Sequence, residues 1–381
     1  MNETQSNDNT TAGASPDGRA VRIGILGGGQ LARMLAIGGL PLGARFVTLD
    51  PAPDACASAV SRHITGNYDD RGRLDQFAAL ADVVTYEFEN VPAESVAYLA
   101  EKLPVYPPAR ALAASRDRLK EKTLFRELSI PTPGFRAVGS PDDLKRAARD
   151  IGLPAVLKTR TLGYDGKGQA VIKSVDDIES AWARAGGVEC ILESFVPFTR
   201  EISIVAAMGR AGEAVFYPVS ENTHRDGILR HTVCRPGDPM QKTAEDYARR
   251  ILEHFGYVGV LALELFDAGG ALMANEIAPR VHNTGHWTIE GAETSQFENH
   301  IRAVTGLPLG GAAALRFNAM VNFIGAIPPA QSILKIKNAH FHDYGKAAKP
   351  GRKLGHATVC GDTMEEAAAG LEELLAVAIV K

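Results

Sequence analysis

The sequence has little cysteine: four in 381 residues, at Cys56, Cys190, Cys234 and Cys360. No two of them have the spacing of a zinc-binding pair, and cysteines so few and so far apart do not form a disulfide framework. Unpaired thiols are typical of proteins in a reducing compartment. The sequence therefore predicts a cytoplasmic protein without structural disulfides.

A long apolar run is also absent. The longest stretch without a charged residue covers residues 317–334, and asparagine, glutamine, serine and two adjacent prolines interrupt it. It is too polar to span a bilayer, so no membrane partner is predicted. Residues 1–20 are rich in Asn, Thr, Ser and Gly and have no signal-peptide core, so we expect a disordered leader there.

Positive charge is not in excess. The 41 Lys and Arg residues against 45 Asp and Glu give a formal net charge of −4, which argues against a nucleic-acid partner. Hydrophobic residues make up 45% of the chain, as in a globular protein rather than a fibrous or disordered one. At roughly 100–200 residues per domain, the length implies two or three domains.

The order of the predicted elements indicates an α/β and α+β fold. Apolar strands at residues 21–26, 45–49 and 83–86 alternate with helical patterns such as residues 73–80, which is typical of βαβ units and a parallel sheet. We therefore assign residues 21–115 to a Rossmann-like domain.

A second module begins near residue 116, with a helical pattern at residues 117–128. It continues with strands around a glycine-rich loop and with two strands joined by a hairpin signal, at residues 155–159, 170–173, 189–192, 202–208, 260–266 and 271–277. We assign residues 116–308 to this domain, with a lid at about residues 155–218. Residues 309–381 form a small β-rich C-terminal domain.

The first glycine cluster, Gly-Gly-Gly-Gln-Leu-Ala at residues 27–32, fits the pattern G-x-G-x-x-A between a strand and a helix, and Asp50 ends the next strand. Backbone amides at such a helix start attract phosphate. Taken alone, the pattern suggests a dinucleotide with Asp50 on its ribose. The alternative is that the glycines only permit a tight turn.

The second domain suggests a nucleoside triphosphate instead. Lys158 precedes the glycine-rich segment at residues 163–169, and such a loop can lay its amides over phosphates while a strand lysine neutralises them. A plain hairpin turn is the alternative for the loop alone. Further on, Glu193 can accept the adenine amino group, the Val196 backbone can read the base edge, and Glu201 can hold ribose hydroxyls.

Glu264 and Glu276 are the strongest feature, because they stand on the two strands of the predicted hairpin. A carboxylate inside an apolar strand is costly unless it is paired or bound to a cation. Two carboxylates with phosphates completing the shell suit Mg²⁺, although one sequence does not fix the hairpin register. Arg280 and His282 follow directly and suit an anion or a transferring phosphoryl group, while a structural role for His282 is the alternative.

In this order the features resemble the ATP-grasp fold, in which ATP lies between two α+β lobes. Within it the chain resembles the N5-carboxyaminoimidazole ribonucleotide synthases, the ATPase subunit of phosphoribosylaminoimidazole carboxylase. The resemblance runs from about Val21 to the C-terminus. Besides the two glycine segments it rests on Thr85-Tyr86-Glu87-Phe88-Glu89-Asn90-Val91, Asn222-Thr223-His224-Arg225-Asp226-Gly227-Ile228-Leu229, residues 275–287 and Pro350-Gly351-Arg352-Lys353-Leu354-Gly355-His356.

The resemblance implies a role for each matching position. ATP would be bound by Arg118, Lys158, Gly163, Tyr164, Asp165, Gly166, Lys167, Gly168, Gln169, Glu193, Val196, Glu201, His224, Asn275 and Glu276. Catalysis would fall to Arg280, His282, Tyr164 and Lys346. The ribotide would meet Gly29, Gln30, Leu31, Glu87, Asn283, Lys346, Arg352 and Lys353. Glu264 and Glu276 would bind Mg²⁺, with a second ion whose shell stays open because Ala278 replaces the asparagine of many ATP-grasp enzymes.

The implied reaction carboxylates 5-aminoimidazole ribonucleotide with bicarbonate, releases ADP and phosphate, and passes through carboxyphosphate, in a homodimer. The first glycine cluster would then receive the substrate's phosphate. A formate-dependent glycinamide ribonucleotide transformylase is the nearest alternative, since it needs the same metal pair. An NAD-dependent oxidoreductase and a non-enzymatic ATP-binding regulator are the others, but the first leaves Glu264 and Glu276 unexplained.

Overall fold

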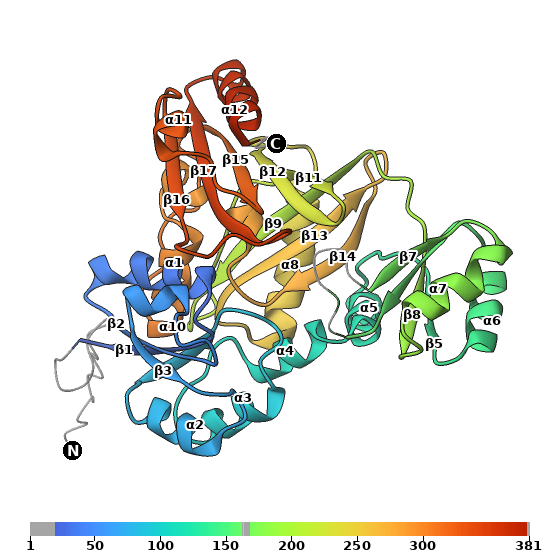
Figure 1. The fold of residues 1–381 in the computed structure, drawn as a ribbon, viewed down its shortest axis with the longest axis horizontal. Helices are drawn as coiled ribbons and strands as arrows, with labels where there is room; N and C mark the ends of the chain where they lie inside the picture. Colours follow the sequence, from blue (N-terminus) through green and yellow to red (C-terminus); the bar gives the residue numbers. More distant parts are fainter. Residues whose placement is uncertain (1–19, 162, 164–167, 379–381) are drawn as a thin grey trace, which may run out of the picture.

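The computed structural model describes residues 20–161, 163 and 168–378. Its strands form three sheets that lie in three lobes around a common centre (Figure 1). The leader expected at residues 1–20 lies outside the described residues except for its last position. Within the part of the chain that is described, no helix is long and apolar enough to cross a membrane.

The first sheet is parallel and has the strand order β3-β2-β1-β4. Its elements are β1 (Arg22–Leu26), α1 (Gln30–Gly39), β2 (Arg45–Asp50), β3 (Arg62–Thr65), α2 (Arg71–Ala78), β4 (Val83–Tyr86) and α3 (Ala93–Ala100). The apolar run that predicts β1 lies in the core, because Ile23, Ile25 and Leu26 have no exposed surface. The predicted βαβ pattern and parallel sheet are confirmed.

The second sheet is antiparallel, with the order β5-β8-β6-β7. Its strands are β5 (Phe135–Val138), β6 (Ala155–Thr159), β7 (Gln169–Ile172) and β8 (Cys190–Ser194), and it packs against α6 (Pro141–Ile151) and α7 (Ile178–Arg184). In the chain it follows α4 (Ala109–Ser115) and α5 (Arg118–Glu127). Helix α5 begins where the Asp117 carboxylate accepts the Leu119 amide, a regular N-cap.

The third sheet has nine strands, in the order β14-β13-β9-β11-β12-β15-β17-β16 with β10 beside β9. They are β9 (Arg200–Met208), β10 (Ala214–Phe216), β11 (Ser220–Arg225), β12 (Ile228–Cys234), β13 (Gly259–Asp267), β14 (Leu272–Ala278), β15 (Phe317–Ile324), β16 (Ala339–Asp343) and β17 (Lys353–Gly361). The C-terminal segment therefore shares a sheet with the preceding domain, because β15 covers the edge of β12 that would otherwise leave its backbone groups unpaired.

The remaining helices join these sheets. They are α8 (Gln241–Phe255), α9 (Thr288–Gly291), α10 (Gln296–Thr305), α11 (Ala330–Leu334) and α12 (Met364–Ala378). Leu31 and Leu35 of α1 share one core with Phe297 and Ile301 of α10, so this contact fixes the first sheet against the third. The loops that leave the carboxyl ends of β1 and β4 therefore face the β13–β14 hairpin across a cleft.

Candidate active site

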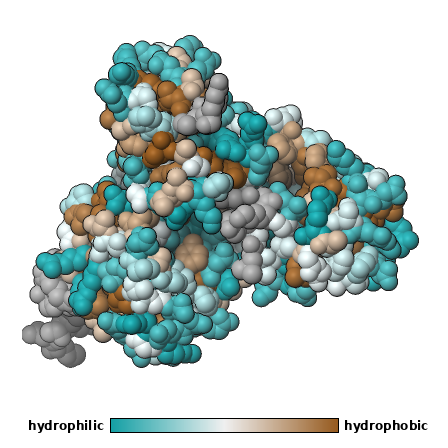
Figure 2. Space-filling model, viewed as in Figure 1, coloured by the Kyte–Doolittle hydropathy of each residue, from teal (hydrophilic) through white to brown (hydrophobic). Residues whose placement is uncertain are grey.

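The cleft has a volume of about 1350 Å³ and is lined by residues of the second and third sheets, of helices α1 and α5, and of loops that include the one after β4. The space-filling view shows the molecule hollowed where the lobes meet (Figure 2). The sequence-predicted residues that line it are Gln30, Leu31, Glu87, Arg118, Lys158, Gly163, Gln169, Glu193, Val196, Glu201, His224, Glu264, Asn275, Glu276, Arg280, His282, Asn283, Lys346, Arg352 and Lys353. Residues scattered over the whole sequence thus meet in one place.

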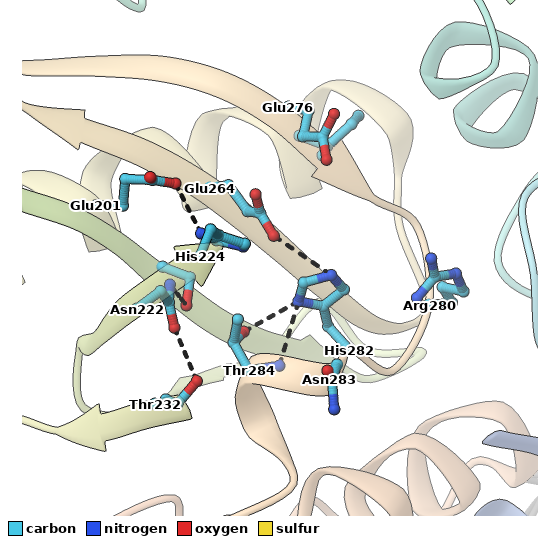
Figure 3. A network of polar contacts seen from close by, with 12 residues as sticks. Glu201, Asn222, His224, Thr232, Glu264, Glu276, Arg280, His282, Asn283 and Thr284 are labelled. Atoms are coloured by element: carbon cyan, nitrogen blue, oxygen red, sulfur yellow. Dashed lines mark hydrogen bonds and ion pairs between the residues drawn. The ribbon is translucent and has the colours of Figure 1, made fainter. Parts of the chain in front are cut away.

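Glu264 and Glu276 are direct partners across the β13–β14 hairpin, so their side chains leave the same face of the sheet (Figure 3). The register shifts immediately after Glu264, where Leu265 pairs with Ala274 and leaves Asn275 as an extra residue. A β-bulge of this kind breaks the alternation of side chains. Asn275 and Glu276, although consecutive, therefore both line the cleft.

The two carboxylates differ in their surroundings. Burial and the charge of Glu276 raise the pKa of Glu264 to about 7. Burial also opposes ionisation of Glu276, but the Arg118 guanidinium, with Nη1 2.9 Å from Glu276 Oε2, lowers its pKa. The two carboxylates face each other, and one of them resists ionisation. A divalent cation between them would stabilise the ionised form of both.

The donors fit Mg²⁺ if phosphates supply the rest of its shell. Within the described residues, no group of three or more His, Cys, Asp or Glu side chains is arranged to hold a metal ion. Mg²⁺ commonly binds through one or two carboxylates together with substrate phosphates. The pair alone therefore suits a cation that arrives with a nucleotide, and Ala278 adds no ligand.

His282 approaches Glu264, with Nε2 3.4 Å from Oε1. Its other nitrogen, Nδ1, lies 3.5 Å from the Thr284 amide, which can only donate. Burial and the Arg280 charge hold the pKa of His282 well below its usual value. The Thr284 hydroxyl lies 3.0 Å from the same Nδ1. The low pKa favours a neutral ring, and Nδ1 accepts from the Thr284 amide.

Arg280 is fixed on one side. Its Nε donates to Glu89 Oε2 at 2.5 Å and its Nη1 to the Val281 carbonyl at 3.1 Å. Glu89 comes from the loop after β4, so this ion pair joins the first sheet to the third across the cleft. A guanidinium anchored in this way presents its remaining N–H groups to an anion in a set plane.

Glu201 and His224 form a second pair beside the carboxylates, with Glu201 Oε2 2.9 Å from His224 Nδ1 (Figure 3). Burial opposes protonation of His224, but Glu201 and Glu264 outweigh it and raise its pKa. Asn222, on the same strand as His224, donates to Ser203 and accepts from Thr232, so hydrogen bonds hold β11 in place.

Lys158 and Glu193 are in contact, with Nζ 2.9 Å from Oε2. The Lys122 and Lys158 ammoniums overcome the effect of burial and lower the pKa of Glu193 to about 2. The other oxygen, Glu193 Oε1, is buried and has no partner among the described residues. A buried acceptor without a donor requires a ligand or water, and here it faces the cleft.

At the far end of the cleft, Glu87 caps helix α1. Its carboxylate accepts the Gly29 amide at 2.9 Å and the Ala32 amide at 3.3 Å, and burial raises its pKa. The Lys346 ammonium reaches Gln30 Oε1 on the same helix end. At the helix start that we expected to receive a phosphate, two amides, those of Gly29 and Ala32, are therefore occupied by Glu87.

Asp50 does not stand free for a ribose. Its carboxylate accepts the amides of Gly28 and Ala52 and the Tyr68 hydroxyl, at 2.9, 2.8 and 2.7 Å. A side chain on Gly28 would come within 2.6 Å of Ala55 Cβ, so a protein segment fills the space above this glycine. The geometry gives no support to the dinucleotide alternative, and the glycines serve the turn and the helix start.

The C-terminal loop between β16 and β17 brings its basic residues to the same end. Lys346, Arg352 and Lys353 all line the cleft. Asn283 also lines the cleft and exchanges two hydrogen bonds with Asn322, at 3.0 and 2.7 Å. This reciprocal pair fixes the orientation of the Asn283 amide.

Some predicted residues do not enter this description. Tyr164, Asp165, Gly166 and Lys167 lie outside the described residues. Gly168 closes the base of the loop, where its carbonyl accepts the Thr159 amide at 2.8 Å.

Three residues near the site had no role predicted from the sequence: Glu89, Glu121 and Lys122. Glu121 is buried, accepts the Ile277 amide at 2.7 Å, and has a pKa raised to about 8 by burial and by Glu276. Lys122 contacts Glu193. The signal was present, because Lys122 stands one helical turn after Arg118 and next to Glu121 on a helix that packs on the site.

Family models match three successive parts of the chain: a ribonucleotide synthetase preATP-grasp domain at residues 20–116, an ATP-grasp domain at residues 123–297, and a phosphoribosylaminoimidazole carboxylase C-terminal domain at residues 318–370. The N5-carboxyaminoimidazole ribonucleotide synthase of Pseudomonas aeruginosa is 56% identical over 358 residues, which are 93% of this chain and 99% of that protein.

Solved structures of the same family are also similar to this chain. The N5-carboxyaminoimidazole ribonucleotide synthetase of Thermus thermophilus is 52% identical with a TM-score of 0.90, covering 93% of this chain and 98% of that one. The N5-carboxyaminoimidazole synthase of Aspergillus clavatus, in complex with ADP and 5-aminoimidazole ribonucleotide, is 32% identical with a TM-score of 0.88, covering 94% and 98%.

Proposed function

The chain belongs to the N5-carboxyaminoimidazole ribonucleotide synthases, ATP-dependent ligases of the ATP-grasp superfamily in purine biosynthesis, and from this premise we propose how its residues carry out the reaction. The reaction consumes ATP and bicarbonate, carboxylates the amine of 5-aminoimidazole ribonucleotide, and releases ADP and phosphate. The similar proteins carry this name rather than that of a formate-dependent transformylase or an oxidoreductase, so those alternatives are set aside.

One observation carries the proposal: a single cleft contains a carboxylate pair, an adenine-side acceptor and a basic ribotide side. Lys158 and Arg118 supply positive charge for the phosphates of ATP, together with the loop at residues 163–169. Glu193 Oε1, the Val196 backbone and Glu201 receive the adenine and ribose, with His224 and Asn275 beside them. Each of these described side chains faces the cleft.

Mg²⁺ would be held by Glu264 and Glu276, where it would neutralise charge on the phosphates. His282 lies beside this pair, with Nε2 3.4 Å from Glu264 Oε1. Arg280, fixed by Glu89, directs its remaining N–H groups at bicarbonate and at the phosphoryl group that it receives. The product of that transfer is carboxyphosphate, whose phosphate can leave, so its carbon becomes open to attack by an amine.

The ribotide would bind at the other end of the cleft. Its phosphate would meet the α1 start at Gly29, Gln30 and Leu31, with Lys346, Arg352 and Lys353 as counter-charges. Glu87 and Asn283 would orient the aminoimidazole ring. Carboxyphosphate hydrolyses readily, so water must be excluded, and we assign that to the loop that includes Tyr164, a catalytic role that rests on the family resemblance.

We also propose a homodimer in the cytoplasm. Leu315 and Leu334, with 61% and 59% of their surface exposed, lie in the apolar region at residues 303–334, which supports an interface there. The four free cysteines agree with a reducing compartment. Sedimentation at a series of concentrations tests the dimer.

ADP release tests the proposed function. We expect rapid ADP release only when ATP, bicarbonate and 5-aminoimidazole ribonucleotide are all present. Formate and glycinamide ribonucleotide should not support ADP release in place of bicarbonate and 5-aminoimidazole ribonucleotide. Release that depends on formate instead would assign the chain to the transformylases.

A further inference from the structure

Lys122 is the most deeply buried cation beside the cleft. Its side chain has 0% exposure, and Nζ lies 2.7 Å from the Asn275 carbonyl oxygen, 3.2 Å from that of Ala274 and 3.4 Å from Glu193 Oε2. All three neighbours are acceptors. An ammonium has three N–H donors, whereas a neutral amine would turn a lone pair toward one of them. Two of the donors make hydrogen bonds to the carbonyls, and the Glu193 carboxylate is the third neighbour. Burial lowers the pKa of Lys122, but the charge of Glu193 opposes this effect, and a site made of acceptors alone favours the charged form.

Glu193 Oε2 is shared by two ammoniums. Lys158 Nζ lies 2.9 Å from it and Lys122 Nζ 3.4 Å, and the Glu193 side chain is 2% exposed. The three groups together carry one net positive charge. Lys158 lines the cleft, and Lys122 is not among the residues that do. The surplus charge is therefore presented to the cleft by Lys158.

In this arrangement Lys158 does not have to neutralise both Glu193 and a phosphate. In the absence of another cation, Glu193 would be neutralised by Lys158 alone, and the pair would carry no net charge toward a phosphate. Attraction between groups this deeply buried is only weakly screened. A second ammonium behind Glu193 removes this competition, because the carboxylate stays paired when Lys158 moves toward another anion.

We propose that Lys122 is a positioning residue that neutralises Glu193 and thereby leaves the charge of Lys158 available to the phosphate groups of the nucleotide. The inference rests on the proposed binding of ATP in this cleft. Lys122 touches no ligand itself. Its bonds to the Ala274 and Asn275 carbonyls also fix β14 next to Glu276. Through Glu193 and β14, Lys122 therefore contacts both the adenine side and the phosphate side of the cleft.

The test is calorimetric titration of Lys122→Met with adenosine, ADP and ATP. Methionine has a similar length and no charge. We expect affinity for ATP to fall roughly tenfold, which is the scale of one partly screened charge a few ångströms away, while affinity for adenosine changes less than about twofold. The loss of affinity for ADP should lie between the losses for ATP and for adenosine. Lys120→Met, on the same helix and exposed, is the matched control and should change none of the three.

A second background separates charge from structure. In Glu193→Gln, no carboxylate competes for Lys158, so adding Lys122→Met should weaken ATP binding less than about twofold further. The double variant also has no charge at position 193, so ATP binding in it is compared with that of Glu193→Gln alone. Equal losses for adenosine and ATP, or no loss for ATP, would overturn the inference. Failure of the unaltered protein to bind ATP would instead overturn the proposed function.

Discussion

Replacing Glu264 by glutamine should make the ligand-free protein more stable while it removes turnover. Glu264 pairs directly with Glu276, and burial with that charge raises its pKa from 4.5 to about 7. Each pKa unit corresponds to about 1.4 kcal/mol, so ionised Glu264 costs the fold about 3 kcal/mol. Glutamine has nearly the same shape and stays uncharged, so the variant avoids this cost.

The gain depends on pH in a defined direction. Since the folded-state pKa of Glu264 is above that of the unfolded chain, its neutral form stabilises the fold fully below about pH 4.5, and this contribution is lost as the pH rises through 7. Glutamine does not titrate. The advantage of Glu264→Gln should therefore grow by about 2 kcal/mol between about pH 5.5 and about pH 8.5.

Urea unfolding with EDTA present measures this difference. Trp287 is 1% exposed and lies in the core shared by the first and third sheets, so its fluorescence reports loss of the sheet that carries Glu264. Glu372→Gln, on exposed helix surface, is the control and should shift stability by less than about 0.5 kcal/mol at either pH. An advantage that is absent, or that shrinks as the pH rises, would refute the reasoning about the carboxylate pair.

Three further predictions concern other parts of the molecule. Glu276→Gln should keep the fold but lower ATP turnover by roughly 100-fold, because a carboxylate that faces the phosphates is lost; a near-normal rate at saturating Mg²⁺ would remove Glu276 from the metal site. Lys353→Ala should raise the KM for the ribotide by roughly tenfold with a smaller effect on the KM for ATP; an unchanged ribotide KM would point to Lys349 or Arg352. His300 is buried, accepts the Val260 amide, and has a pKa lowered to about 3 by burial. As the pH falls, this histidine is therefore protonated in the unfolded chain before it is protonated in the folded protein. In urea unfolding, the free energy of unfolding of the native protein should therefore fall by about 1.3 kcal/mol more than that of His300→Asn between about pH 7.5 and about pH 5.5. Equal losses would count against a neutral His300.

The sequence predicted the β13–β14 hairpin and its two glutamates, because apolar runs around Asp-Ala-Gly-Gly identify such a turn. It did not predict that Glu264 and Glu276 are direct partners, since a one-residue bulge at Asn275 sets the register and leaves no mark in the residue pattern. Only the folded chain shows that Asn275 and Glu276 face the same cleft.

The buried partners were missed for a different reason. Glu89 stood in a matching motif but had no assigned role, and Lys122 had none either, because long-range packing brings Glu89 to Arg280 and Lys122 to Glu193. The sequence also did not predict that the C-terminal strands continue the third sheet, because the pairing of β15 with β12 spans some ninety residues, which no local pattern encodes.

In the proposed mechanism, Glu264 and Glu276 together bind a divalent cation against the phosphates of the nucleotide. Anomalous diffraction from crystals grown with ADP and Mn²⁺ would locate this cation. We expect an anomalous peak between the two carboxylates and next to a phosphate oxygen. A nucleotide bound in the cleft without a peak there, or with its peak at other side chains, would contradict it.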